Sequence, residues 1–273
     1  MRVAIAAPFL LVFLFAAVSM PVAADVLERD CKHLIEAIER ANAGHAARVE
    51  LEPGALYLLD RVRLEGRGLP LLRGVLSIDG RGASIRGYPG IEEPLFHVAP
   101  GARLELRGLT LAEGAAGALL NHGSVDLLQV NMEDNSVVRA PAVVTNHGRL
   151  RIDGSELRHN LIRAGRREAG TVINYGVLEI VASAFHDNAI DRSEHSVVVA
   201  GSVLNRGQLS IDGVAAIGNW PIDDPERRGF GEIVDLGTGV TQGDARTRLV
   251  RAGSQLSTPA PFPDDLPPLR LGR

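Results

Sequence analysis

The chain has 273 residues, enough for one large domain, and its aromatic content of only 4% with 30 glycines favours thin strands and tight corners over a helical core. Its formal net charge of −4, with Lys32 as the only lysine, gives no argument for nucleic-acid binding. The single cysteine, Cys31, excludes an internal disulfide, so packing and hydrogen bonds must stabilise the fold.

Residues 1–24 have the pattern of a secretory signal peptide. Arg2 precedes a long apolar run that ends near Val18, and small residues follow up to Ala24, after which we expect cleavage. An uncleaved anchor is the alternative, although the break at Pro21 argues against it. No later segment is apolar over a length that spans a bilayer. We therefore expect an exported mature chain, periplasmic, extracellular or on the cell surface, with no transmembrane segment.

Residues 25–44 predict an amphipathic helix. Apolar residues recur at helical spacing on one face, and Gly44 follows as a stop signal. A stack of strands has an open end with unpaired edges, and an amphipathic helix is a common cover for such an end. We interpret this segment as an N-terminal capping helix. Its apolar face consists of Val26, Cys31, Leu34, Ile35 and Ile38.

Residues 45–222 contain a repeated sequence motif. It consists of Asn-x-Gly, apolar residues two and four places after the glycine, usually another nine places after it, and an asparagine at twelve. Corresponding positions 74, 102, 123, 148, 176 and 207 are 28, 21, 25, 28 and 31 residues apart. Each unit has room for short strands but for no helix, so strands one turn apart must lie parallel and in register, which predicts an all-β, single-stranded parallel β-helix. The four best copies begin at Asn121, Asn146, Asn174 and Asn205 and end at Asn135, Asn160, Asn188 and Asn219.

The repeat also predicts where side chains point. The residues two, four and nine places after each glycine should stack in columns inside the coil, and the residue three places after should face solvent. The length variation falls between the asparagine at twelve and the next Asn-x-Gly, where we expect loops at residues 163–168 and 191–196. We expect the glycine of Asn-x-Gly to supply a corner with positive φ.

The pattern fades after residue 222. Ile233-Val234 and Leu249-Val250 favour one or two closing strands within residues 223–256. Residues 257–273 are rich in proline and predict a disordered or loosely docked tail.

The repeats resemble those of exported bacterial proteins. Cys31 with Leu34, Glu36, Ala37 and Ile38 resembles the Cys-Ser-Leu-Arg-Glu-Ala opening of many secreted β-helix proteins, although Lys32-His33 interrupts that signature. The likeness covers residues 31–220 and implies an exported right-handed parallel β-helix of the pectin-lyase type, often surface-associated, without shared catalytic residues. The repeats of polymorphic outer-membrane-protein β-helices are matched by Gly117-Ala118-Leu119, Gly170-Thr171-Val172, Gly201-Ser202-Val203 and, as the one copy with a phenylalanine, Phe185-His186-Asp187-Asn188.

Two sets of residues are conspicuous along the coil. We expect Asn135, Asn160, Asn188 and Asn219 to form a structural ladder, in which each side-chain amide bridges its own turn and the neighbouring one. The middle residues of Asn-x-Gly form a column of planar polar groups, suited to stacking on sugar rings, to a metal shared by two histidines, or to a solvated surface without a ligand. Trp220, the only tryptophan, either covers the C-terminal end of the stack or contacts a ligand. The column consists of His122, His147, Tyr175 and Arg206.

Charged residues ten and eleven places after the glycine form a candidate acid–base surface. Carboxylates and imidazoles on neighbouring turns, about 5 Å apart, suit general acid–base chemistry of the pectin-degrading kind, or electrostatic pairing alone. The sequence lacks a complete polygalacturonase-like set and the clustered aspartates of a calcium-dependent lyase, so we expect neither a cofactor nor a metal. The candidates are Glu133, Asp134, His159, His186 and Asp187.

These patterns favour a non-catalytic, adhesin-like binding or structural module of the cell surface or extracellular space. A glycan or another component of the cell envelope is the expected partner. The alternative is a polysaccharide lyase or glycoside hydrolase of the pectinase-like β-helix type.

Overall fold

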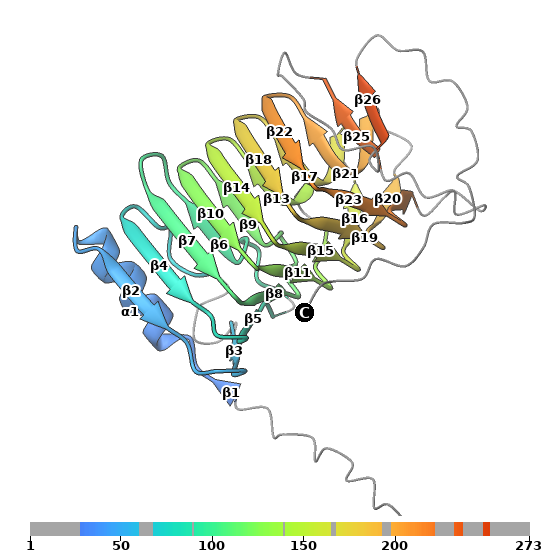
Figure 1. The fold of residues 1–273 in the computed structure, drawn as a ribbon. Helices are drawn as coiled ribbons and strands as arrows, with labels where there is room; N and C mark the ends of the chain where they lie inside the picture. The colour runs from blue at the N-terminus through green and yellow to red at the C-terminus, as the bar shows by residue number, and fades with distance from the viewer. Residues whose placement is uncertain are drawn as a thin grey trace, which may run out of the picture.

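The chain folds into a parallel β-helix, in which consecutive turns lie one on the next (Figure 1). Strand pairs along the described coils are parallel, as the repeat predicted. The predicted signal peptide, residues 1–24, and the proline-rich tail, residues 257–273, lie outside the described residues and stay predictions. The computed structural model describes residues 28–59, 68–88, 90–138, 140–164, 168–192, 198–221, 232–236 and 248–251.

Four sheets, which we call A to D, run along the described part of the chain. Sheet A contains β1 (Glu28–Arg29), β3 (Leu56–Leu58), β5 (Ser84–Arg86), β8 (Thr110–Ala112), β11 (Asn131–Glu133), β15 (Glu156–Arg158), β19 (Ala184–His186) and β23 (Ala215–Ile217). Sheet B contains β2 (Ala47–Glu50), β4 (Val75–Asp79), β7 (Arg103–Arg107), β10 (Ser124–Leu128), β14 (Arg149–Asp153), β18 (Val177–Val181) and β22 (Gln208–Asp212). Sheet C contains β6 (Phe96–Val98), β9 (Leu119–Asn121), β13 (Ala142–Asn146), β17 (Glu168–Asn174), β21 (Val198–Asn205), β25 (Glu232–Asp235) and β26 (Arg248–Arg251). Sheet D contains β12 (Ser136–Val137), β16 (Leu161–Ala164), β20 (Ala189–Arg192) and β24 (Trp220–Pro221).

The register within the sheets confirms the predicted columns. In sheet B, Val125 lies opposite Leu104 on one side and Leu150 on the other, and all three side chains are buried. In sheet A, the buried Phe185 lies between Leu157 and Ala216. Burial of each such aliphatic or aromatic side chain is worth roughly 1.5–3 kcal/mol, so these columns form the continuous core of the coil.

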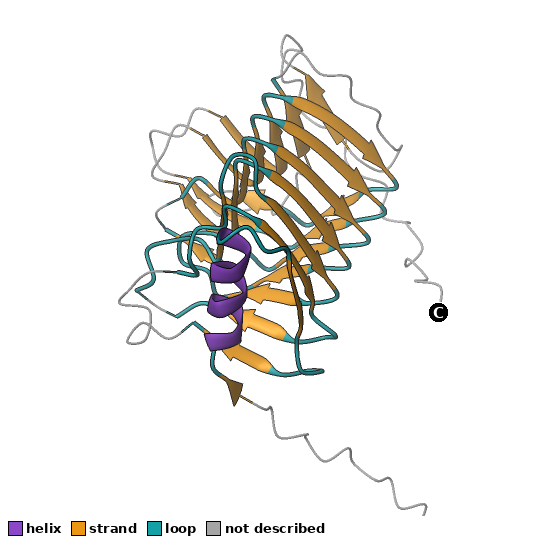
Figure 2. Cartoon of the chain, turned by 90° about the vertical axis from the view of Figure 1, so that its left-hand side faces the viewer, coloured by secondary structure: helices purple, strands orange, loops and turns teal. Residues whose placement is uncertain are grey.

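The N-terminal helix covers the first turn of the stack, in front of the strands in Figure 2. Helix α1 (Lys32–Asn42) buries Leu34, Ala37, Ile38 and Ala41 against the core of the coil. The side chain of Asn42 then fixes the helix end, because it donates to the carbonyl of Leu71 and accepts from the amide of Arg73. The predicted helix began too early, since residues 28–29 form strand β1 and pair with β3. Among the described residues, no helix combines the length and apolar character needed to cross a membrane.

The glycine of Asn-x-Gly has a different role from the predicted positive-φ corner. A Cβ on Gly148 would lie 2.0 Å from the carbonyl oxygen of Gly123, and a Cβ on Gly176 would lie 2.1 Å from that of Gly148. Glycine is therefore required because the backbones of successive turns approach closely at this corner. The positive φ occurs instead just before the ladder asparagines, at Asp134, His159, Asp187 and Gly218, with φ of 54°, 52°, 56° and 70°.

On the flank between sheets D and C, strands extend into both expected loops, and residues 165–167 and 193–196 of these loops lie outside the described residues. Of the expected loops at residues 163–168 and 191–196, residues 163–164, 168 and 191–192 belong to strands. Cross-turn pairing of β16 with β20 and of β17 with β21 extends these strands, since each backbone satisfies the hydrogen bonds of the next. The predicted closing strands are present as β25 and β26, which continue sheet C.

Candidate functional site

One asparagine ladder runs through the corner between sheets A and D, as predicted. Each buried asparagine donates its side-chain N–H to the Oδ1 of the next, over 2.7–2.8 Å, through Asn135, Asn160, Asn188 and Asn219. The same Oδ1 atoms accept backbone N–H groups from the preceding turn, for example from Asn135 to Asn160 over 3.1 Å. The ladder thus supplies hydrogen-bond acceptors for buried backbone N–H groups at the corner, where these groups have no partner in a strand.

A second ladder, which was not predicted from the sequence, runs through the asparagines of Asn-x-Gly. Asn121, Asn146, Asn174 and Asn205 donate side-chain N–H groups in succession over 2.6–2.7 Å. The last of them, Asn205, donates to Oδ1 of Asp235 over 2.8 Å. The register pairs Asn205 with Asp235, so an aspartate replaces asparagine where strand β25 continues sheet C. The repeat did contain the signal for this ladder, because both of its asparagines recur in all four copies.

The predicted column of planar groups is a stack of rings. The rings of His122 and His147 lie 4.7 Å apart at 4°, and those of His147 and Tyr175 lie 4.8 Å apart at 5°. His97 adds a tilted ring 5.8 Å from His122. It was not predicted from the sequence because it precedes the four copies that match the repeat best. Both faces of the His147 ring are therefore covered by neighbours, and only ring edges are left for a sugar or another ligand.

Stacking changes the electrostatics of the histidines. Burial first, and the neighbouring His122 second, lower the pKa of His147 below its ordinary value. The same two causes lower the pKa of His97, against an opposing effect from Glu93. Both effects disfavour the imidazolium form, because a second positive charge a stacking distance away is repelled and a buried charge loses hydration. The column therefore favours the neutral forms of His97 and His147.

The far end of the column is held by Glu168. Its carboxylate accepts hydrogen bonds from the hydroxyl of Tyr175, over 3.2 Å, and from the guanidinium of Arg206, with 3.0 Å to Nε. The hydrogen bond that Arg206 donates to Glu168 raises the pKa of Arg206. Burial, and after it the charge of Glu168, raises the pKa of Tyr175. Trp220 lies apart from this column, in strand β24 beside Ala189, and its side chain lies outside the described residues.

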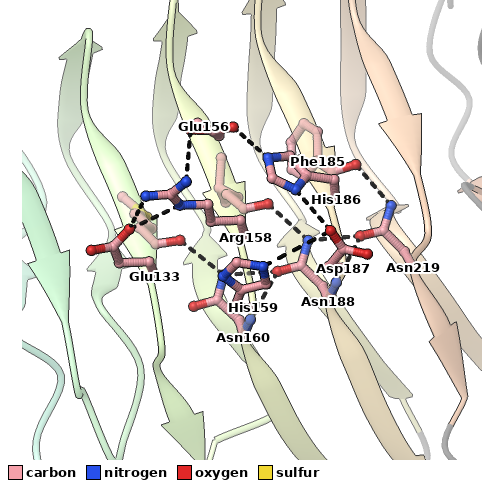
Figure 3. Close-up of polar contacts among 12 residues, drawn as sticks. Glu133, Glu156, Arg158, His159, Asn160, Phe185, His186, Asp187, Asn188 and Asn219 are labelled. Atoms are coloured by element: carbon pink, nitrogen blue, oxygen red, sulfur yellow. Dashed lines mark hydrogen bonds and ion pairs between the residues drawn. The ribbon is translucent and has the colours of Figure 1, made fainter. Parts of the chain in front are cut away.

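Of the candidate acid–base residues, Glu133 and His186 lie on strands of sheet A, and His159 and Asp187 lie at the corner directly beside it (Figure 3). Glu133 and Arg158 are paired across neighbouring turns, and both Nε and Nη2 of the arginine bind Oε2 of the glutamate, at 2.9 and 2.6 Å. The hydrogen bond that Arg158 donates to Glu133 is the main cause that raises the pKa of Arg158. Asp134 is exposed at the corner and acts on Arg158 only through its charge.

His186 joins two carboxylates in the same surface. Its Nε2 contacts Oε1 of Glu156 in a short hydrogen bond, and its Nδ1 lies 3.1 Å from Oδ2 of Asp187. His159 approaches from the preceding turn, with Nε2 3.9 Å from the same Asp187 oxygen, and its ring meets that of His186 edge to face. The structure thus brings together three of the predicted residues, His159, His186 and Asp187. It adds Glu156, which strand alternation around the buried Leu157 could have placed on this face.

Parallel coils with internal asparagine ladders define the class of this protein as a parallel β-helix repeat protein. Comparison with models of protein families gave no match for this chain, and searches among curated proteins and solved structures gave none either.

Proposed function

We propose that this chain is an exported, non-catalytic binding and structural module of the cell surface or the extracellular space. The signal-peptide pattern of residues 1–24 supports export. The resemblance of residues 31–220 to polymorphic outer-membrane-protein repeats supports a surface role. A rigid coil whose turns are joined by two ladders is suited to hold an extended surface in one shape.

The observation that carries the non-catalytic assignment is the pairing of Glu133 with Arg158. Cleavage of a glycosidic bond generally needs two carboxyl groups that face each other across an open position for the sugar. Here Arg158 binds the carboxylate of Glu133 through two nitrogens, and His186 engages both Glu156 and Asp187. The charged groups of this face are therefore directed at one another, which favours electrostatic pairing over acid–base catalysis.

The alternative is a polysaccharide lyase or glycoside hydrolase that uses the same face. The proximity of His159 to Asp187 favours it, because a histidine beside a carboxylate is a common general base. This function would require substrate to displace at least one of the ion pairs now present.

A glycan of the cell envelope is the partner we propose for the ring column. Both faces of the His147 ring are covered, so recognition would use the exposed edge of His147, the exposed part of Tyr175 and the guanidinium of Arg206. These groups offer hydrogen-bond donors and acceptors of the kind that bind sugar hydroxyls.

Incubation of the purified chain with a panel of polysaccharides tests both functions. Binding is measured by affinity electrophoresis, and turnover by reducing-end and unsaturated-product assays. We expect binding without product, weakened by Arg206→Ala and unchanged by Arg48→Ala, an exposed arginine at the opposite end of the coil. Product formation that His159→Ala abolishes would establish the enzyme instead, and failure to bind any envelope glycan would exclude the proposed partner.

A further inference from the structure

Three metal-ligand side chains meet at one corner of the coil, with His159 on one turn and His186 and Asp187 on the next (Figure 3). One ligand atom from each lies within 4.8 Å of the others. Oδ2 of Asp187 is 3.1 Å from Nδ1 of His186 and 3.9 Å from Nε2 of His159. We propose that these residues bind a divalent transition-metal ion of the zinc class, although the sequence analysis predicted no metal.

Only one of the three side chains has to move to complete the coordination. Zinc bonds of about 2.0–2.2 Å place tetrahedral ligand atoms roughly 3.3–3.5 Å apart. The atoms of His186 and Asp187 are already about this far apart, at 3.1 Å. His159 has to approach, and 53% of its side chain is exposed, so its ring has room to rotate. Three protein ligands then leave the fourth position to water or to an exchangeable group.

Glu156 supplies the outer partner that such a site needs. Its carboxylate is hydrogen-bonded to Nε2 of His186, so in the metal-bound form the ring proton would stay on Nε2 and Nδ1, beside Asp187, would offer its lone pair to the ion. A carboxylate on the remote nitrogen of a histidine fixes the tautomer and the ring orientation, and makes the ligating nitrogen more basic. Arg158, 3.8 Å from Glu156, holds this carboxylate from its other side.

The backbone fixes the two corners that carry the ligands. His159 and Asp187 both have positive φ, and each directly precedes a ladder asparagine. The hydrogen bond from Asn160 to Asn188, 2.8 Å long, joins the two turns immediately beside the ligands. The spacing of His159 and Asp187 is therefore set by a buried ladder and does not depend on a loop.

The donor set determines the kind of metal. Two imidazole nitrogens and one carboxylate oxygen suit zinc, iron(II), nickel or copper. Calcium and magnesium instead prefer sites made entirely of oxygen. Zinc is accordingly the probe for the experiment, and cobalt is its spectroscopic substitute.

The test is calorimetric titration of the full, chelator-treated chain with zinc chloride. We expect a single saturable site, which His159→Asn and Asp187→Asn abolish. Both replacements fit the positive-φ corner, since asparagine tolerates that conformation, and circular dichroism checks that the coil is intact. Glu156→Gln should weaken zinc binding roughly 10- to 100-fold. His33→Asn removes an exposed histidine in helix α1 and should leave binding unchanged.

Cobalt provides an independent readout, because a site with two histidines and one aspartate should give the visible absorption bands of tetrahedral Co²⁺. These bands should be lost in Asp187→Asn and retained in His33→Asn. The proposal is overturned if the chain shows no saturable zinc site, or if His159→Asn binds zinc as tightly as the unmodified chain. It is also overturned if His147→Asn abolishes binding, since the ion would then belong to the ring column.

Discussion

The side-chain amide of Asn160 donates to Oδ1 of Asn188 over 2.8 Å, and both residues are fully buried in consecutive turns of the coil. Oδ1 of Asn188 also accepts the backbone N–H of Asn160, over 3.2 Å. The side-chain oxygen of Asn188 therefore accepts hydrogen bonds from a side chain and from a backbone group of the preceding turn at once. Since the corner leaves these groups without strand partners, the ladder has a direct energetic consequence.

Asn160→Ala should lower the free energy of unfolding by about 3–4 kcal/mol. The change removes hydrogen bonds to Asn135, Asn188 and the carbonyl of Met132, and leaves the buried amide of Asn135 without its acceptor. Urea unfolding measures the loss. Asp134→Asn is the control, because this exposed corner residue keeps a conformation that asparagine tolerates, and should change stability by less than about 0.5 kcal/mol. Equal stability of the two variants would contradict the structural role of the ladder.

Gly148→Ala should destabilise the coil by about 3 kcal/mol or more. The new Cβ would lie 2.0 Å from the carbonyl oxygen of Gly123, so two turns would have to separate. Gly154→Asn is the matched control, because Gly154 has φ of 56° and a Cβ there would lie 3.6 Å from Cγ of Gln129, an ordinary contact distance. Thermal unfolding of both variants distinguishes close approach from backbone conformation. If Gly154→Asn were the more damaging of the two, the reason given for the glycine would be wrong.

Phe185→Ala should cost about 3–5 kcal/mol, because it opens a cavity in a column that already narrows at Ala216. Ile217→Ala provides the comparison one turn further along, since 56% of Ile217 is exposed and its truncation leaves no cavity. Urea midpoints of the two variants should differ clearly. A small loss for Phe185→Ala would show that the core repacks at this turn.

Stability should fall as the pH drops below about 6.5, the ordinary pKa of histidine. The folded-state pKa values of His97 and His147 are lowered, so the unfolded chain binds more protons between the lowered values and the ordinary one. Stability is then fully present above the ordinary pKa and is lost as the pH falls toward the lowered values. Melting temperatures across this range measure the loss. His147→Gln should reduce the pH dependence, His33→Gln should not, and identical profiles for all three proteins would refute the effect.

The core of the fold was predictable because parallel stacking superposes equivalent positions of the repeat. Leu104, Val125 and Leu150 follow one another in the sequence pattern as they do in sheet B, so periodicity alone placed them. The role predicted for the glycine of Asn-x-Gly, a positive φ, was wrong. The glycine is needed because two turns approach closely there, and this depends on the path of a neighbouring backbone. Likewise, residues 163–164 and 191–192 became strands through pairing with adjacent turns, which local sequence does not encode.

The candidate site was only partly predictable. The sequence placed His159, His186 and Asp187 on neighbouring turns of one face, but it gave no indication that Glu156 would orient His186. The partnership of Glu168 with Arg206 spans 38 residues and depends on where strand β17 begins. Such contacts follow from rotamers and strand ends, which the repeat leaves free.

By itself, the sequence determined the direction of stacking, the inward columns and the ladder from Asn135 to Asn219, because each turn repeats the same short-range pattern. Only the tertiary structure decided which contacts these outward side chains make across turns, namely the stacking of the ring column, the addition of His97 to it and the hydrogen bond between Glu156 and His186. The physical reason is that burial constrains inward residues to one side of a strand, whereas the contacts of outward residues are set by neighbours that only the assembled coil brings within reach.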